Sequence, residues 1–230
     1  MKWIFKWLLR LFLLAVVLVV ILLLSLNSIL RVLMEHQIRA QTGMEARIGK
    51  FSLGLLDPEM TIQDLKLFNT PEFGGTLFLS IPEIHVEYDR DALRQGEIHL
   101  TLLRFNLGEL DIVKNEAGHT NIFSMGLNLP PPQKLGNGKP APMSGVDFEK
   151  QTGLKFKSID VLNLSVGTAN FIDLRDQQQN RSQKIDLENV KINNVRSLGD
   201  LSGFGVILAL RGGDFFYSLA DPKSVSPIWK

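Results

Sequence analysis

The stretch IPEIHVEYD, residues 81–89, decides the fold class because apolar and polar residues alternate along it. From residue 84 to residue 88, isoleucine, valine and tyrosine fall on one face of an extended chain, and histidine and glutamate fall on the other. A period of two is typical of a β-strand with one buried face. Pro82 has no backbone N–H, so we expect it at the start of its strand or at a sheet edge.

The same alternation recurs on both sides of this stretch. It is seen at residues 61–68, 98–102, 162–166 and 204–210, with a shorter candidate at 110–113. Clusters of Asn, Asp, Pro and Gly separate these segments and predict turns. The pattern predicts a mainly β protein, with an antiparallel, twisted, groove-like sheet built from hairpins.

Two short features interrupt the strands. Residues 91–94 favour one helical turn, capped by Asp89 or Asp91. In the segment 185–192 the alternation changes phase at Glu188-Asn189, which predicts a β-bulge.

One phrase occurs twice in the part of the chain that is rich in strands. The sequence IQDLKL at 62–67 is similar to LENVKI at 187–192, in the form I-x-[DN]-[LV]-x-[LI] with leucine first in the later copy. Either the two halves are loose copies of one unit, or strands resemble each other by chance.

The N-terminus predicts a single long helix, residues 5–42. Leu11 to Leu24 is an unbroken apolar run, and residues 8–30 are mostly apolar. At about 1.5 Å per residue, such a segment can cross a hydrocarbon core of about 30 Å. Trp3 and Trp7 suit an anchor at one membrane interface.

The charges around this helix predict its orientation. Three basic residues and no acidic one precede residue 11, so we expect a cytoplasmic N-terminus and an exported remainder. A cleaved signal peptide is the alternative, but residues 25–31 contain no small-x-small cleavage site. Residues 29–41 keep an amphipathic helical spacing up to Thr42-Gly43, where we expect the helix to end. This extension either packs on the exported domain, lies at the membrane interface, or is a plain spacer.

Composition divides the chain further. Residues 124–147 hold half of its ten prolines and predict a flexible or polyproline-like loop. We therefore expect five segments: 1–42, the transmembrane helix with its amphipathic extension; 43–123, a β unit; 124–147, the Pro/Gly-rich loop; 148–220, a second β unit; and 221–230, a loose tail.

Several function classes are excluded or disfavoured. The absence of cysteine excludes disulfides, thiol catalysis and cysteine-based zinc sites. The net charge is +1 with no basic cluster outside the N-terminus, which argues against nucleic-acid binding. The four histidines lack metalloprotease spacing, and neither a nucleophile elbow nor a phosphate-binding loop occurs. We expect no enzyme activity, no metal and no cofactor, with His85 and His99 solvated on polar strand faces.

Three phrases follow the helix in a recognisable order: TIQDLKLFN at 61–69, IPEIHVEYD at 81–89 and NEAGHTNI at 115–122. With the helix and IGKF at 48–51, they make residues 1–123 similar to the N-terminal region of AsmA-family proteins of Gram-negative envelopes. The resemblance implies a single-pass inner-membrane protein with a periplasmic β-rich domain, associated with outer-membrane assembly and phospholipid traffic. It supplies no catalytic residues.

A sheet with one apolar face could shelter lipid without any active residue. Each buried methylene is worth about 0.8 kcal/mol, so exposing a chain of about 16 carbons costs of order 12 kcal/mol. The alternative is that the same residues form a closed core or pack against the helix. The candidates for the lipid-facing side are Leu65, Leu67, Ile84, Val86, Leu100, Leu102, Leu162, Leu164, Val166, Val206, Leu208 and Leu210.

The leading hypothesis is a non-enzymatic, membrane-anchored periplasmic protein of envelope maintenance that shelters or transfers phospholipid. The alternative is a structural subunit of an envelope or secretion assembly that binds a protein partner by adding a strand to its sheet. An envelope hydrolase is a third hypothesis, for which the sequence offers no cleft of converging groups.

Overall fold

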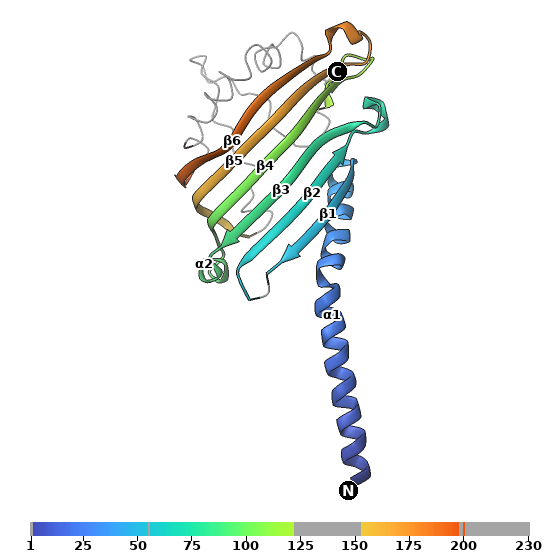
Figure 1. The fold of residues 1–230 in the computed structure, drawn as a ribbon, viewed down its shortest axis with the longest axis vertical. Coiled ribbons are helices and arrows are strands. Elements are labelled where there is room, and N and C mark those ends of the chain that lie inside the picture. Colours follow the sequence, from blue (N-terminus) through green and yellow to red (C-terminus); the bar gives the residue numbers. More distant parts are fainter. Residues whose placement is uncertain (1, 55, 122–152, 198–199, 201–230) are drawn as a thin grey trace.

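The computed structural model describes residues 2–54, 56–121, 153–197 and 200. It consists of one large sheet and a long helix that lies along one side of the sheet and projects beyond it (Figure 1). The elements are α1 (Lys2–Thr42), β1 (Glu45–Leu53), β2 (Glu59–Phe68), η1 (Pro71–Phe73), β3 (Leu77–Tyr88), α2 (Arg90–Arg94), β4 (Glu97–Lys114), β5 (Lys155–Asp173), η2 (Gln177–Gln179) and β6 (Arg181–Val195).

The sheet has six strands in the order of the sequence, β1 to β6. All neighbours are antiparallel except β4 and β5, which are parallel. The prediction of a mainly β fold is confirmed, but the prediction of a purely antiparallel sheet is wrong. A parallel pair needs a long crossover connection instead of a hairpin, and here residues 115–154 join the end of β4 to the start of β5.

Part of the sequence prediction falls outside the described residues. The Pro/Gly-rich loop at 124–147, the strand at 204–210 with its candidates Val206, Leu208 and Leu210, and the tail at 221–230 are not described. The short helix at 91–94 is confirmed as α2, and Asp89 caps it by accepting hydrogen bonds from the backbone of Asp91 and Ala92.

Helix α1 is continuous up to Thr42, as predicted. Gly43 ends it with a φ of 71°, and its N–H donates to the Arg39 carbonyl at 2.9 Å. Leu30, Met34 and Ile38 pack against the buried residues of the first strands, so the amphipathic extension packs on the sheet.

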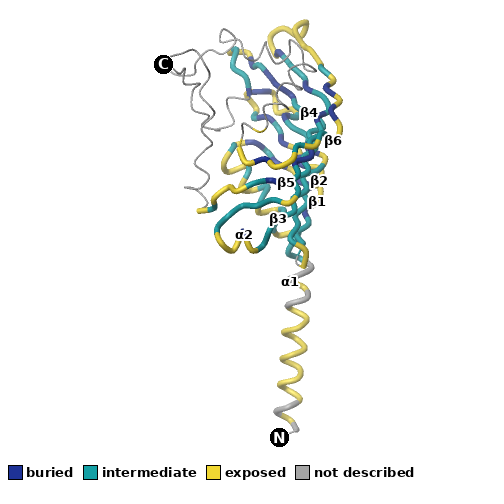
Figure 2. The backbone as a smooth tube through the Cα atoms, turned by 90° about the vertical axis from the view of Figure 1, so that its left-hand side faces the viewer, coloured by how far each residue is buried: buried dark blue, intermediate teal, exposed yellow. Residues whose placement is uncertain are grey.

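The N-terminal half of α1 stands clear of the sheet, and its described side chains are exposed (Figure 2). Among the described residues, no helix is long and apolar enough to qualify as a membrane span. The membrane-spanning role of residues 8–30 stays a prediction.

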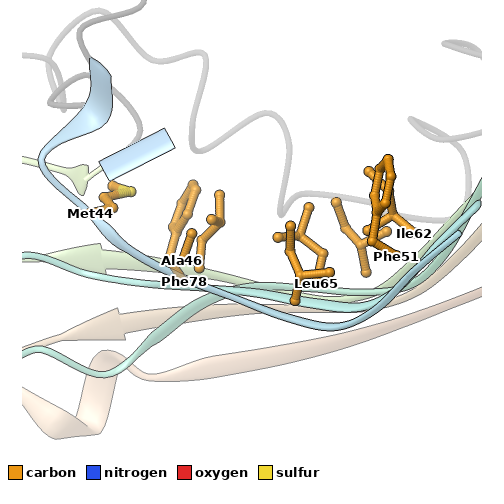
Figure 3. Packing of buried hydrophobic residues seen from close by; sticks show 9 residues of the cluster. Met44, Ala46, Phe51, Ile62, Leu65 and Phe78 are labelled. Atoms are coloured by element: carbon orange, nitrogen blue, oxygen red, sulfur yellow. The ribbon is translucent and has the colours of Figure 1, made fainter. Parts of the chain in front are cut away.

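One face of the sheet is apolar, and we call it the apolar face. Its side chains form three neighbouring clusters, and Figure 3 shows the first of them on the hollow side of the curved sheet. The fully buried members are Met44, Ala46, Ile48, Phe51, Ile62, Leu65, Leu67, Phe78 and Ile81 in the first cluster, Ile112, Val166, Ala169, Ile185 and Leu187 in the second, and Ile159, Leu162 and Val195 in the third.

Every strand changes the phase of its alternation in a band that crosses the sheet, and β4, β5 and β6 change it a second time nearer α2, at Leu100 and Leu103, Ile159 and Leu162, and Ile192 and Val195. In the band that all six strands share, which we call the crease, two successive residues of the apolar face are three positions apart instead of two. The six pairs are Ile48 and Phe51, Ile62 and Leu65, Ile81 and Ile84, Leu107 and Leu110, Val166 and Ala169, and Leu187 and Val190.

Small residues allow the strands to approach closely at the crease. A Cβ atom on Gly49 would lie 2.8 Å from the Cβ of Asp64, and one on Gly108 would lie 3.0 Å from the Cγ of Pro82. A Cβ on Gly167 would collide with the carbonyl oxygen of Gly108 on the neighbouring strand. Glycine in a strand interior commonly marks such a close approach.

Pro82 lies in the interior of β3, between β2 and β4, and the prediction of a strand start or sheet edge is wrong. The regular pairing with β2 skips from Ile81 to Glu83, and the pairing with β4 skips from Ser80 to Glu83. The ladder is therefore interrupted at the position where proline has no N–H to donate.

The repeated phrase has the same unusual backbone in both copies. Asp64 has a φ of 53° and Asn189 has a φ of 52°, and they occupy the same position in the phrase. Asp and Asn adopt this left-handed conformation more readily than other residues with side chains. At Glu188-Asn189 the pairing with β5 also shifts, which confirms the predicted bulge.

We expect Asp64→Val to lower the free energy of unfolding by about 1–2 kcal/mol, because a β-branched residue is disfavoured at positive φ. Asp64 is exposed, so little packing is lost. Gln63→Val, at the exposed neighbour, is the control and should change stability by less than about 0.5 kcal/mol. Denaturant unfolding followed by circular dichroism measures both, and equal effects would contradict the role of the left-handed backbone.

Candidate functional site

The apolar face carries two uninterrupted rows that cross the whole sheet. In each row the six residues pair with one another from strand to strand. With strands about 4.8 Å apart, a row is about 24 Å long. One row is Phe51, Ile62, Ile84, Phe105, Leu164 and Val190, and the other is Leu53, Met60, Val86, Leu103, Leu162 and Ile192.

Burial varies along these rows. Phe51 and Ile62 are fully buried near α1, whereas Phe105, Leu164 and Val190 are only half-buried. Among the described elements, α1 is the only helix that packs across this face, and it does so over β1. Apolar side chains in the middle of the sheet thus keep part of their surface exposed.

The structure brings most predicted lipid-facing residues together. Leu65, Leu67, Leu162 and Val166 are buried in the clusters. Ile84, Leu100 and Leu164 pack against them, and Val86 lies in the second row.

Leu102 does not share this face. It pairs with Glu87 and Val161, whereas Leu103 pairs with Val86 and Leu162 in the apolar row. The pairing of β3 with β4 shifts between Glu87 and Tyr88, so the alternation slips by one residue after Leu100.

Side chains of α1 bind the outer edge of β1. Asn27 Oδ1 accepts from the Leu53 N–H at 3.2 Å, and Glu35 Oε1 accepts from the Ile48 N–H at 2.7 Å. Arg31 donates to the Gly49 carbonyl at 3.3 Å. These residues are four positions apart and therefore lie along one side of the helix. They satisfy backbone groups that an edge strand otherwise leaves open to another strand.

The opposite face of the sheet is polar. One row across it consists of Ser52, Thr61, His85, Arg104, Asn163 and Lys191. A shallow hollow of about 290 Å³ lies on this face and includes Glu83, Arg104, Asn106, Ser165 and Asn189 in its wall. Arg104 forms an ion pair with Glu83 at 3.1 Å, so the two charges neutralise each other.

His99 is held between two carboxylates on the polar face. Its Nε2 lies 3.0 Å from Asp160 and its Nδ1 lies 3.3 Å from Asp89. The hydrogen bond to Asp160 raises the pKa of His99, and Asp89 acts in the same direction. Backbone hydrogen bonds from Ala92 and Asp91 lower the pKa of Asp89. The imidazole ring thus links β4 to β5 and to the cap of α2.

His85 and His36 differ in their exposure and in their contacts. His85 hydrogen-bonds Thr61 at 2.8 Å and Glu87 at 3.3 Å, and only 15% of its side chain is exposed, so it is more enclosed than predicted. His36 is exposed on α1. The described residues contain no group of three or more metal-ligating side chains.

A buried amide network closes the end of the sheet far from α2. Asn121 is fully buried, accepts from the Val113 N–H at 3.0 Å, and donates at 2.8 Å to Asn69 and to the Asp111 carbonyl. Asn170 donates to the carboxylate of Asp111 at 2.7 Å. Burial raises the pKa of Asp111.

This network explains two phrases of the sequence. Asn69 ends the phrase at 61–69, and Asn121 ends the turn that begins at Asn115. Asn115 Oδ1 accepts from the His119 N–H at 2.9 Å, and Gly118 has a φ of 88°. Asn69 and Asn121 therefore have structural roles.

Comparison of the chain with protein-family models, with curated proteins and with solved structures finds no match.

We expect Asn121→Ala to lower the free energy of unfolding by about 3 kcal/mol, because it leaves the Val113 N–H and the Asp111 carbonyl buried without their partner. Asn121→Asp keeps the acceptor for Val113 but loses both donations. Alanine at Asn193, which is exposed on β6, is the control and should cost less than about 0.5 kcal/mol. Thermal or denaturant unfolding of the three variants tests this, and a neutral Asn121→Ala would refute the network.

We expect the His99 contact to stabilise the fold at low pH. Because the folded pKa is raised above 6.5, this stabilisation is complete below about pH 6.5 and is lost as the pH rises through the folded pKa. His99→Gln should remove this part of the pH dependence, whereas His36→Gln should leave it unchanged. Unfolding measured from pH 5.5 to pH 9 tests the prediction, and an unchanged slope in His99→Gln would contradict it.

Proposed function

We propose that this protein is a membrane-anchored β wall that shelters phospholipid acyl chains on its apolar face, without catalysis. The observation that carries the proposal is the pair of apolar rows that continue over all six strands. Their central members, such as Phe105 and Leu164, keep surface that is not fully buried by the described residues.

The energetics favour an apolar occupant over a polar one. Each methylene removed from water is worth about 0.8 kcal/mol, so contact with a row about 24 Å long can offset much of the roughly 12 kcal/mol needed to expose an acyl chain. This requires no specific polar contact, which agrees with the lack of charged residues in the two rows.

The anchor in this proposal is the N-terminal half of α1. Trp3, Trp7, Leu11 and Phe12 are each more than half exposed, and the apolar residues around them surround the helix on every side. An apolar surface of this kind is costly in water and favourable in a bilayer. Leu24 ends the apolar run.

The basic residues before the run orient the anchor with a cytoplasmic N-terminus and a periplasmic sheet. The resemblance of residues 1–123 to the AsmA family supports an inner-membrane location and a role in outer-membrane and envelope maintenance. A protein partner in an envelope or secretion assembly is the competing proposal.

The competing proposal requires a sheet edge that can accept a strand. At β1 the side chains of Asn27, Arg31 and Glu35 already bind the outer backbone groups, so a partner strand would have to displace them. This observation argues against strand addition at β1.

Leu103 and Leu102 provide a matched test, because they are adjacent, identical and on opposite faces. We expect a photoreactive amino acid at position 103 to cross-link to phospholipid in cells, and one at position 102 to give little lipid adduct. Mass spectrometry of the purified protein identifies the adducts. Protein adducts at position 103 in place of lipid would instead support the scaffold.

Leu103→Asp should also reduce the lipid that copurifies in mild detergent by at least about tenfold, because a carboxylate in the row costs more than about 1.4 kcal/mol. Leu102→Asp should retain the lipid. Equal lipid content in both variants would overturn the proposal.

A further inference from the structure

Exposed apolar side chains outside α1 concentrate at one end of the sheet. Among the described residues, the large ones are Leu56, Leu93, Phe156 and Leu174. Leu56 lies in the loop between β1 and β2, Leu93 lies in α2, and Phe156 is the second residue of β5, all at the same end. We call these three residues the proximal rim. Leu174 lies beyond β5 at the opposite end.

The proximal rim is held together by hydrogen bonds between its segments. The Arg90 guanidinium of α2 donates to the Leu56 carbonyl. The Tyr88 N–H donates to the Pro58 carbonyl at 2.9 Å, and the Lys155 N–H donates to the Gly96 carbonyl at 2.8 Å. The three exposed apolar side chains therefore lie on segments whose backbones are held together by hydrogen bonds.

The apolar half of α1 leaves the sheet at this same end (Figure 1). Asn27 binds the Leu53 N–H, one residue before the loop that carries Leu56 begins. At about 1.5 Å per residue, Asn27 is about 4.5 Å along the helix from Leu24, where the apolar run ends. A helix fixed to β1 in this way places Leu56, at the β1 end of the proximal rim, close to the level at which the apolar run stops.

The charges near the proximal rim balance one another. Arg94 pairs with Asp91 at 3.0 Å, and Lys157 pairs with Glu97 at 2.8 Å. A surface with balanced charges and protruding leucines suits the apolar part of a membrane interface better than a highly charged partner.

We propose that the proximal rim inserts Leu56, Leu93 and Phe156 into the interfacial layer of the bilayer that holds α1. The inference rests on the proposed function, because it requires α1 to be the anchor. It adds that the sheet stands on the membrane surface, with the β1 end of the row from Leu53 to Ile192 next to the lipid. Acyl chains would then reach the apolar face without crossing water.

The chain contains no cysteine, so single labels can be placed without background. Leu56→Cys, Leu93→Cys and Phe156→Cys report on the proximal rim, Leu14→Cys reports on the anchor, and Leu174→Cys is the matched exposed control. Each full-length variant carries an environment-sensitive fluorophore and is reconstituted into phosphatidylcholine vesicles that contain a nitroxide-labelled lipid. We expect quenching at positions 14, 56, 93 and 156, with little at position 174.

The outcomes separate the two proposals. Quenching at position 14 with rim positions no more quenched than position 174 would overturn the inference and leave the anchor intact. The absence of quenching at position 14 would overturn the anchor and the inference with it. Rim quenching that disappears in 1 M salt would overturn apolar insertion, because screening removes charge attraction and spares apolar contact.

A second set of variants tests the apolar contact itself. Leu56→Asp and Leu93→Asp together should lower the quenching at position 156 severalfold and leave that at position 14 unchanged. Both residues are exposed, so folding should be retained, and a circular dichroism spectrum checks this. Unchanged quenching at position 156 would contradict the inference.

Discussion

A strand keeps one face apolar only as long as its side chains alternate, and each of the six strands breaks that alternation at the crease. A phase change in a single strand would send the rest of its apolar residues to the polar face. The changes in neighbouring strands must therefore lie close to one another, as they do in the crease. The strands achieve this by different means: glycine in β1, β4 and β5, a left-handed Asp64 in β2, Pro82 in β3 and a bulge at Asn189 in β6. With the crease in place, long strands can bend and still present a continuous apolar surface.

The crease also determines what the helix can bind. Leu30, Met34 and Ile38 of α1 pack on the apolar face, and Asn27, Arg31 and Glu35 bind the edge backbone of β1. These two parallel stripes fix both the rotation of the helix and its height on the strand. Arg31 binds Gly49, a residue of the crease, so the helix is positioned by the irregularity itself.

Much of this architecture could be predicted from local patterns. The helix end at Gly43, the cap at Asp89, the bulge at Asn189 and most of the apolar face follow from spacing and turn chemistry. The parallel pairing of β4 with β5 could not be predicted, because alternation is the same for both strand directions. The opposite placement of Leu102 and Leu103 depends on a register shift with another strand, which has no local signal. The partners of His99 were also missed, since Asp160 is 61 residues away along the chain.

The hydrogen bonds between α1 and β1 close one edge of the sheet. A β architecture with two unprotected sides can be widened on either of them when a strand pair is duplicated. In this protein a new strand pair beside β1 would have to displace α1, which is already hydrogen-bonded to that strand. We therefore expect an enlarged version of this sheet to gain strands on the side away from α1.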